Sequence, residues 1–279
     1  MAQIIKKKSE LIKVRNKIKQ NKIGFVPTMG NLHQGHLSLM KNLAEKSDLL
    51  FISIFVNPTQ FGPNEDFNNY PRTLEKDLEL IISLNLNIPV IVFAPENMSE
   101  VYPEKFHTTF SIPSLDNCLC GSSRPGHFNG VLSVIFHLFN LVKPTIAIFG
   151  QKDYQQYLII KSFCQDFFPS INIEMSPIIR ESNGLALSSR NGYLNSFEKI
   201  DALYLHQKLL EIKNDLEKKS LKSIELYKVN LENLQWDYLE ILDAENLKTP
   251  TIESKKFLIA GALFVHQKVR IIDNIILEL

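Results

Sequence analysis

Short apolar runs alternate with helical patterns over roughly the first 175 residues of the chain. Five runs have the length and composition of strands: 23–27, 49–57, 88–93, 145–150 and 171–175. Four intervening segments carry apolar residues at helical spacing: 36–48, 73–85, 128–143 and 154–167. The run at 49–57 is almost continuously apolar, which is typical of a strand covered on both faces. The pattern therefore predicts a Rossmann-like, doubly wound α/β fold with a parallel sheet.

The first twenty residues combine a lysine cluster with regularly placed aliphatic residues. We expect a short amphipathic helix here. The positions expected on its inner side are Ile4, Ile5, Leu11, Ile12, Val14 and Ile18.

The pattern changes after about Pro177. A polar loop containing glycine and serine spans 178–194, and two helical patterns follow at 196–219 and 221–234. Three strand-like runs complete the chain, at 236–244, 256–265 and 269–279. We therefore expect a Rossmann-like domain over 1–176 and a smaller α+β lid domain over 177–279.

Composition and charge narrow the possible classes of protein. Hydrophobic residues make up 44% of the 279 residues, which is enough for a substantial core. The 31 basic and 30 acidic residues nearly cancel, so a nucleic-acid partner is not expected. No run approaches the roughly 18 apolar residues of a membrane span, and the start lacks a signal-peptide core. A cytoplasmic location without a membrane partner follows as an expectation. Three cysteines, an odd number, agree with it, and Cys118-x-Cys120 has the wrong spacing for a usual zinc site.

The residues that could carry chemistry are concentrated between the strand predicted at 23–27 and the helix predicted at 36–48. The stretch PTMGNLHQGH (27–36) places His33 and His36 around Gly35, with Gly30 upstream. The glycine spacing is that of a phosphate-binding loop, but His36-Leu37 replaces the Lys-Ser/Thr of that motif. A helix start offers N–H groups and a positive dipole end to an anion, and imidazoles add directional donors. One histidine could instead cap the helix while the other is packed. The paired histidines favour a phosphate-binding site over this structural role.

Five blocks together resemble one family. PTMGNLHQGH resembles the HxGH signature of the nucleotidyltransferase superfamily. A longer similarity, to the pantothenate synthetase (pantoate–β-alanine ligase) family, continues through FVNPTQFGPNEDFNNYPRTLEKD, RPGHFNGVLSVIFHLFNLVKP, FGQKDYQQ and GLALSSRNGYL. The blocks are in order and extend from residue 25 to residue 194. Gln151 stands where the family usually has glutamate, whereas Lys152 and Asp153 are retained.

The resemblance implies an ATP-dependent ligation in two steps. Pantoate would attack the α-phosphate of ATP to give pantoyl adenylate and pyrophosphate. β-Alanine would then displace AMP to give pantothenate. Such chemistry needs charge stabilisation at the phosphates and two reactants held in line. The family also implies Mg²⁺ with the ATP and a homodimer.

The resemblance assigns roles by position. The catalytic set is His33, His36, Lys152 and Arg190, with His36 the usual candidate for proton donation. The implied ATP-binding positions are Met29, Gly30, Asn31, Leu32, His33, Gln34, Gly35, His36, Gly150, Gln151, Lys152, Asp153, Ile179, Leu187, Ser188, Ser189 and Arg190. Gln60 would bind pantoate near the β-alanine position, and Gln156 would also bind pantoate.

Some positions allow two interpretations. Asp77 could help hold Mg²⁺, which prefers carboxylate and phosphate oxygens. Alternatively, it could be a carboxylate in the first turn of a helix that interacts favourably with the positive end of the helix dipole. Arg124 and His127, at the start of an apolar helix, could close a substrate pocket, or His127 could cap or pack. His137, inside that helix, is expected to be a buried histidine whose hydrogen bonds are satisfied.

Three rival functions follow from the same residues. The chain could be an adenylyltransferase that acts on another small acid, although Gln60 and Gln156 argue against it. It could be a catalytically silent metabolite-binding protein, although Lys152 and Arg190 argue against that. A nucleic-acid-binding module is the poorest of the three because the charge is balanced.

Overall fold

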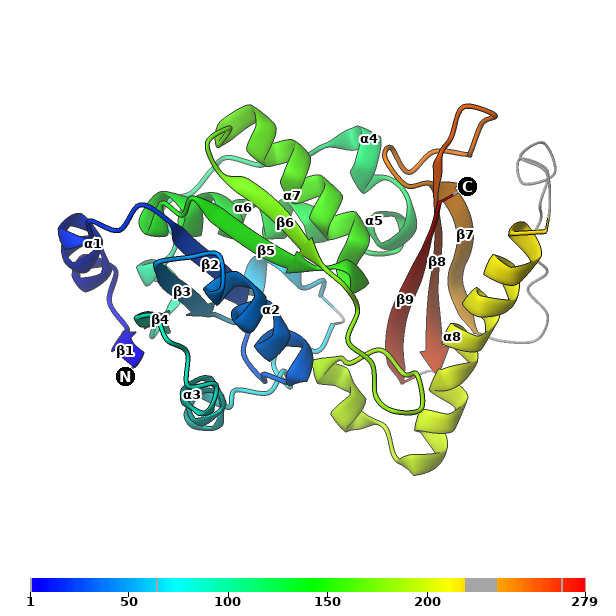
Figure 1. Cartoon of the computed structure of the whole chain (residues 1–279), viewed down its shortest axis with the longest axis horizontal. Coiled ribbons are helices and arrows are strands. Elements are labelled where there is room, and N and C mark those ends of the chain that lie inside the picture. Colours follow the sequence, from blue (N-terminus) through cyan, green and yellow to red (C-terminus); the bar gives the residue numbers. More distant parts are fainter. Residues whose placement is uncertain (1, 64, 219–234, 267, 279) are drawn as a thin grey trace. The chain divides into compact units, whose positions relative to one another are not determined.

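The computed structural model describes residues 2–63, 65–218, 235–266 and 268–278 (Figure 1). The chain forms two compact units. The first consists of 1–112, 124–150 and 159–176, and the second of 113–123, 151–158 and 177–279. Segments 113–123 and 151–158 thus belong with the C-terminal part of the chain. The boundary expected at residues 176 and 177 stays a prediction.

The first unit contains a six-stranded parallel sheet. Its strands, in the spatial order β1-β4-β3-β2-β5-β6, are β1 (Ala2–Ile5), β4 (Val90–Phe93), β3 (Leu49–Ile54), β2 (Ile23–Thr28), β5 (Ile146–Gly150) and β6 (Asn172–Ser176). The chain proceeds outward from β2 through β3 to β4, and then returns to the other side of β2 with β5 and β6. The order therefore reverses between β2 and β5, the position at which doubly wound sheets bind ligands beyond their carboxyl ends. The predicted Rossmann-like fold is confirmed.

Helices cover both faces of this sheet. On one face pack α2 (Gln34–Ala44) and α3 (Leu74–Ser83), which bury Leu37, Met40 and Ile81 against alternate strand residues such as Ile52. The other face carries α6 (His127–Val142), whose Phe139 ring meets Phe25 edge to face at 5.9 Å. Burial of both strand faces explains why the strands are apolar runs without alternation.

The N-terminal prediction is wrong in part. Residues 2–5 form strand β1, parallel to β4, and the helix α1 spans only Lys8–Lys17. Ile5 and Leu11 are fully buried as expected, but Ile4 and Ile12 are each 42% exposed. The carbonyl of Ile5 accepts the N–H of Ala94 at 2.9 Å. A short apolar run fits a strand or a helix equally well, and the available edge of β4 selects the strand.

The C-terminal part of the second unit is a three-stranded antiparallel sheet covered by one long helix (Figure 1). The strands are β7 (Trp236–Asp243), β8 (Lys256–Val265) and β9 (Val269–Glu278), and the helix is α8 (Ser196–Leu216). Aliphatic residues of α8 pack on the sheet in one core cluster. Asn195 and Glu198 form a capping box at the start of α8. The predicted smaller α+β part is confirmed, while the helix predicted at 221–234 lies outside the described residues.

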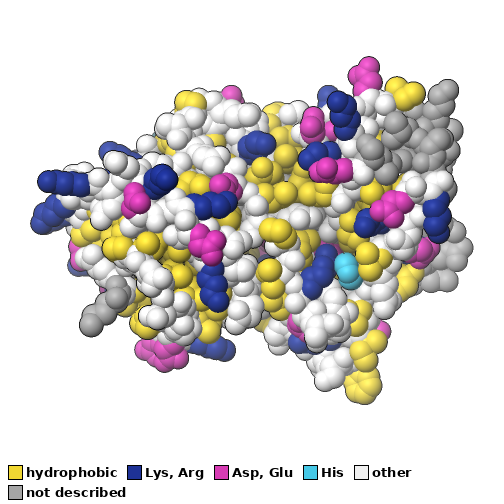
Figure 2. Space-filling view, in the orientation of Figure 1, with side chains coloured by type: hydrophobic (Ala, Val, Ile, Leu, Met, Phe, Trp, Pro, Cys, Tyr) yellow, Lys and Arg dark blue, Asp and Glu magenta, His cyan; other side chains and the backbone are white. Residues whose placement is uncertain are grey.

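The remaining segments of this unit are short. They comprise α4 (Pro113–Asp116), α5 (Leu119–Ser123), the 3-10 turns η3 (Gln151–Asp153) and η4 (Ser189–Tyr193), and the start of α7 (Tyr154–Phe167). On the face drawn in Figure 2, basic and acidic side chains are interspersed, in keeping with the net charge of +1.

Candidate active site

A tight turn follows β2 and leads into α2. Gly30 has φ +83° and Asn31 has φ +49°, both in the left-handed region. A Cβ atom on Gly30 would lie 3.0 Å from Oδ2 of Asp77 and 3.1 Å from Cγ2 of Ile54. The turn therefore requires glycine both for its backbone angle and for its close approach to Asp77.

Asp77 anchors this turn from the first turn of α3. Its Oδ2 accepts the N–H of Asn31 at 3.0 Å and the hydroxyl of Thr73 at 3.2 Å, and its Oδ1 accepts the N–H of Leu32 at 2.8 Å. The side chain is buried, with 1% exposure. Both oxygens face hydrogen-bond donors, an environment that suits an anchor and not a metal ligand. The expectation that Asp77 helps to hold Mg²⁺ is not supported by this geometry and stays a prediction.

His33 and His36 form a reciprocal cap at the start of α2. Nδ1 of His33 accepts the N–H of Gly35 at 3.1 Å, and the same side chain accepts the N–H of His36, while Nδ1 of His36 accepts the N–H of His33 at 3.4 Å. The ring centroids lie 4.2 Å apart. A nitrogen that accepts an N–H carries no proton, so each neutral ring has its proton on Nε2. The two interpretations of these histidines are therefore compatible: they cap the helix with one nitrogen and keep the other as a donor.

Gln60 lies in the 3-10 turn η1 (Pro58–Gln60), beyond the carboxyl end of β3. Its Nε2 donates to the sulfur of Met29 at 3.2 Å, and its Oε1 accepts from Nδ2 of Asn57 at 3.0 Å. Asn57, 1% exposed, also donates to the carbonyl of Gly130 at 3.1 Å. A Cβ atom on Gly130 would lie only 2.2 Å from the carbonyl oxygen of Thr59. Glycine in α6 thus lets η1 rest directly on the helix, which sets the position of Gln60.

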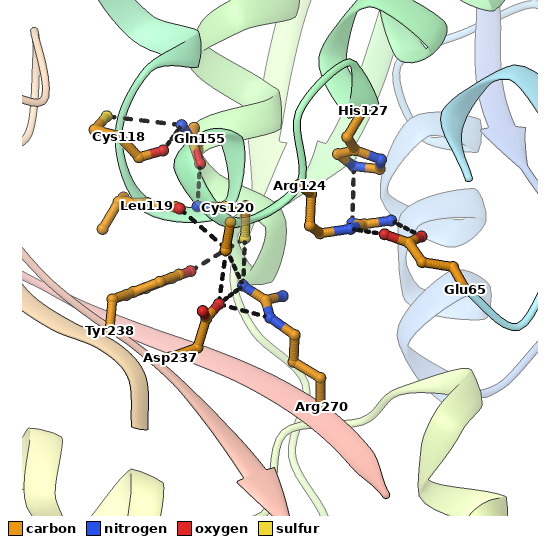
Figure 3. A network of polar contacts seen from close by, with 11 residues as sticks. Glu65, Cys118, Leu119, Cys120, Arg124, His127, Gln155, Asp237, Tyr238 and Arg270 are labelled. Carbon is orange, nitrogen blue, oxygen red and sulfur yellow. Dashed lines mark hydrogen bonds and ion pairs between the residues drawn. The ribbon is translucent and has the colours of Figure 1, made fainter. Parts of the chain in front are cut away.

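A chain of polar contacts runs from Glu65 through Arg124 to His127 (Figure 3). It ends at the main chain of Gln60. The guanidinium of Arg124 donates to both carboxylate oxygens of Glu65, at 2.7 and 2.5 Å, and its Nη1 lies 3.1 Å from Nε2 of His127. Nδ1 of His127 lies 2.7 Å from the carbonyl oxygen of Gln60. A guanidinium only donates and a carbonyl only accepts, so these partners assign the proton of His127 to Nδ1. Burial raises the pKa of Glu65, but hydrogen bonding and charge from Arg124 outweigh it, and the net pKa is lowered.

In the second unit, the turn η3 follows Gly150 and carries Lys152. Its ammonium lies 3.2 Å from the carboxylate of Asp153. Of the two glutamines that follow, Gln155 is 5% exposed, and its amide donates to the carbonyls of Leu115 and Cys118 and accepts the N–H of Cys120. Gln155 is therefore structural. The neighbouring Gln156 is half-buried and keeps its predicted pantoate role as a prediction.

The loop after β6 folds into a short hairpin. The N–H of Leu187 donates to the carbonyl of Ile179 at 2.9 Å, and a bridge pairs Arg180 with Ala186. The hydroxyl of Ser188 accepts the N–H of Arg190 at 3.2 Å and caps η4. The hairpin brings together Ile179 and Leu187, two positions that the resemblance assigns to ATP.

The structure thus places the predicted residues in two groups. In the first unit, Met29, His33, His36 and Gln60 follow β2 and β3, while the second unit holds Lys152, Gln156 and the 179–190 hairpin. The expected gathering of both groups around one triphosphate stays a prediction. Sequence reasoning missed four residues that hold these segments: Asn57, Glu65, Asp273 and Asn274. Among the described residues, no group of three or more histidine, cysteine or acidic side chains could hold a metal ion.

A doubly wound parallel sheet whose central strand ends in a His-x-Gly-His turn defines the class of α/β nucleotide-binding enzymes. Comparison with known proteins narrows this class. The family model described as Pantoate-beta-alanine ligase matches residues 3–276. The chain belongs to the pantoate-beta-alanine ligase family, which confirms the resemblance and the prediction of an enzyme.

Similar proteins cover nearly the whole chain. The pantothenate synthetase of Thermosipho africanus is 45% identical over an alignment of 282 positions, which covers 98% of this chain and 99% of that protein. The one from Fervidobacterium nodosum is 48% identical over 261 residues, 92% of this chain and 91% of that protein. A crystal structure of pantothenate synthetase from Thermus thermophilus has a TM-score of 0.84 at 34% identity and covers 98% of both chains.

A further solved structure includes ligands. The pantoate-beta-alanine ligase of Francisella tularensis was crystallised with beta-gamma ATP and beta-alanine. It has a TM-score of 0.75 at 34% identity and covers 99% of this chain and 97% of its own. Within the described ranges, no helix combines the length and hydrophobicity needed to cross a membrane. The homodimer and the cytoplasmic location stay predictions.

Proposed function

We propose that this chain condenses pantoate with β-alanine through a pantoyl-adenylate intermediate, releasing AMP and pyrophosphate. Membership of the family supports the overall reaction. The similar F. tularensis ligase, complexed with beta-gamma ATP and beta-alanine, supports ATP and β-alanine as substrates. The observation that carries the proposal is the reciprocal cap of His33 and His36, which fixes two imidazoles as Nε2–H donors beside the turn after β2.

The reaction balances without a proton donor. In the first step a carboxylate oxygen of pantoate bonds to the α-phosphorus of ATP, and the bond to the bridging oxygen breaks with its electrons leaving on pyrophosphate. In the second step the neutral amine of β-alanine bonds to the acyl carbon, the bond from that carbon to the phosphate oxygen breaks so that AMP leaves as an anion, and the amine nitrogen loses a proton to solvent. Both leaving groups are phosphates, which depart as anions. The negative charge that develops on these leaving groups must be stabilised, and pre-organised hydrogen-bond donors supply that stabilisation.

The two histidines suit hydrogen bonding better than proton transfer. A second proton on His36 would occupy Nδ1, the nitrogen that accepts the N–H of His33 at 3.4 Å. The cap therefore favours the neutral ring, whose Nε2–H donates to a phosphate oxygen. In this proposal Lys152 and Arg190 add positive charge at the phosphates, and Gln60 and Gln156 orient pantoate. Mg²⁺ would neutralise triphosphate charge when bound to ATP.

Pantoate-dependent exchange of labelled pyrophosphate into ATP tests the first step directly. We expect exchange with pantoate and not with other small acids, and formation of AMP when β-alanine is added. His36→Ala should lower the exchange rate by roughly two orders of magnitude, the scale of losing one transition-state donor. His107→Ala, which replaces an exposed histidine of the same unit, is the matched control.

The outcomes separate the rival functions. Exchange that depends on another acid would point to a different adenylyltransferase. Absence of both exchange and AMP formation in folded protein would point to a silent binding protein. Wild-type exchange in a folded His36→Ala variant would remove the role assigned to that ring.

A further inference from the structure

Two adjacent residues of β9 reach opposite faces of the small sheet. Asp273 and Asn274 are 4% and 3% exposed, and they pair with Gly261 and Ala260 of β8. Successive side chains of a strand project to opposite faces. On one face Asp273 meets Arg180 and His206, and on the other Asn274 meets the η3 turn. All of these residues belong to the second unit.

Asn274 holds the main chain of η3. Its Nδ2 donates to the carbonyl of Gln151 at 2.9 Å and to that of Lys152 at 3.0 Å, and its Oδ1 accepts from Nε2 of Gln151 at 3.2 Å. Two carbonyl oxygens can only accept, so the orientation of the amide is fixed by its partners. One side chain thus uses both its donors and its acceptor on the segment that carries Lys152.

Asp273 holds the 179–190 hairpin. Its oxygens accept from both terminal nitrogens of Arg180, Oδ2 from Nη1 at 2.6 Å and Oδ1 from Nη2 at 2.9 Å. Nη1 of Arg180 also donates to the carbonyl of Gly184 at 3.1 Å, which ties the guanidinium across the hairpin. Nδ1 of His206 lies 3.2 Å from Oδ2. Burial raises the pKa of Asp273, but His206 and Arg180 outweigh it and hold the pKa below its ordinary value.

We propose that Asp273 and Asn274 are a pair of positioning residues for the ligation reaction, in which Asn274 sets the place of Lys152 and Asp273 sets the place of the hairpin that ends in Ser188–Arg190. Neither side chain is assigned to substrate, so each acts through the segment it holds. The inference rests on the proposed function, because Lys152 and Arg190 matter only if they act on a phosphate. It goes beyond that function because it assigns to one strand, β9, the positioning of both η3 and the 179–190 hairpin, which lie about 30 residues apart in sequence.

Asn274→Asp is the sharpest substitution. It keeps the shape of the side chain but turns an oxygen toward the carbonyls of Gln151 and Lys152, and the repulsion displaces the turn. We expect kcat/KM for ATP in pantoate-dependent exchange to fall by roughly 10- to 100-fold, the range for a misplacement of about 1 Å. Asn140→Asp, at an exposed position of α6, is the matched control and should retain the wild-type value.

A double-mutant cycle distinguishes positioning from general structural support. If Asn274 acts through Lys152, Asn274→Asp should cost little, within about twofold, when Lys152→Met is already present, since groups that act as a unit are not additive. Asp273→Asn is tested in the same way on an Arg190→Met background. If the fold reductions in kcat/KM from the two single substitutions multiply in both cycles, the inference is overturned. It is also overturned if the Asn274→Asp variant has the wild-type kcat/KM.

The design keeps the two proposals separate. Absence of pantoate-dependent exchange in the wild type would overturn the proposed function. If the wild type is active but the substitutions in each cycle lower kcat/KM independently of one another, only the positioning pair is overturned. If Asn274→Asp does not unfold cooperatively, Asn274→Ser replaces it in the same cycle, because a hydroxyl can still donate to one carbonyl.

Discussion

His33 and His36 each accept a main-chain hydrogen bond from the other residue: the side chain of His33 accepts the N–H of His36, and Nδ1 of His36 accepts the N–H of His33. This reciprocity starts helix α2 and selects the tautomer of both rings. Folding and proposed chemistry thus depend on different nitrogens of the same side chains. Variants of either histidine should therefore be compared for helix stability as well as for rate.

Asp77→Asn should loosen the turn after β2. The amide retains one acceptor but turns an NH₂ group toward a loop N–H, so one buried donor loses its partner. We expect a loss of about 1–3 kcal/mol in the free energy of unfolding and a rise in the KM for ATP. Urea unfolding and steady-state kinetics check both effects. Asp166→Asn, an exposed position of α7, is the control, and unchanged KM and stability in Asp77→Asn would contradict the anchoring role.

Gly130→Ala should displace the turn that bears Gln60. The added methyl would lie 2.2 Å from the carbonyl oxygen of Thr59 and 2.5 Å from the amide nitrogen of Gln60, so η1 must move. Overpacking of this kind costs about 1–3 kcal/mol of stability. The KM for pantoate should rise with it. Gly192→Ala, where nothing lies within 4 Å of the new Cβ, provides the comparison. A normal KM in the Gly130 variant would show that the close contact between η1 and α6 does not set the position of Gln60.

Asp237→Ala should destabilise the second unit through Arg270. The guanidinium donates to Oδ2 of Asp237 at 2.9 and 2.7 Å and lies beside the thiol of Cys120 (Figure 3). Both side chains of the pair are less than one-fifth exposed, so removing one leaves a largely buried charge. We expect a loss of about 2–4 kcal/mol, somewhat below the range for fully buried pairs.

Adding Arg270→Met to that variant should recover part of the loss, because the unpaired charge is removed as well. Urea unfolding of both single variants and the double variant measures this coupling. Glu217→Gln, which breaks a more exposed pair with Lys213 in α8, should change stability by no more than about 0.5 kcal/mol. Strictly additive losses in the double variant would show that Asp237 and Arg270 are not energetically coupled.

Asp273 should make stability depend on pH in the acid range. Its lowered pKa means that it contributes stability above its unfolded-state pKa of about 4, and that this contribution is lost as the pH falls through the folded-state value. The difference in unfolding free energy between wild type and Asp273→Asn should therefore be largest near neutral pH and shrink below about pH 4. Urea unfolding from pH 7 to pH 3 gives this profile. A difference that stays constant would contradict the assignment.

Local patterns were sufficient for much of the fold. The apolar run predicted as a strand at 49–57 became the inner strand β3 (Leu49–Ile54), and the periodic segment Tyr154–Phe167 became helix α7 with the expected bounds. These elements are predictable because burial on two faces, or on one helical stripe, leaves a local trace in the sequence. β1 was missed because four residues carry too short a pattern to separate strand from helix.

Contacts between distant residues left no such trace. The histidine motif could be read because both rings lie within four positions of one another. Asp77 contacts Leu32 across 45 positions, and Asn274 contacts Gln151 across 123. No periodicity links such residues, and an acidic or amide side chain has many ordinary uses. The anchors of the candidate site therefore became visible only when the fold brought them to their segments.

Asp273 and Asn274 project to opposite faces of the small sheet, so the contacts they make depend on the register in which β8 and β9 pair. A slip of one residue between these strands would exchange the two faces. It would turn a carboxylate toward the carbonyls of η3 and leave the guanidinium of Arg180 opposite a neutral amide. Lengthening or shortening β9 by a single position ahead of Asp273 would thus disturb both held segments at once, even though neither segment had been altered.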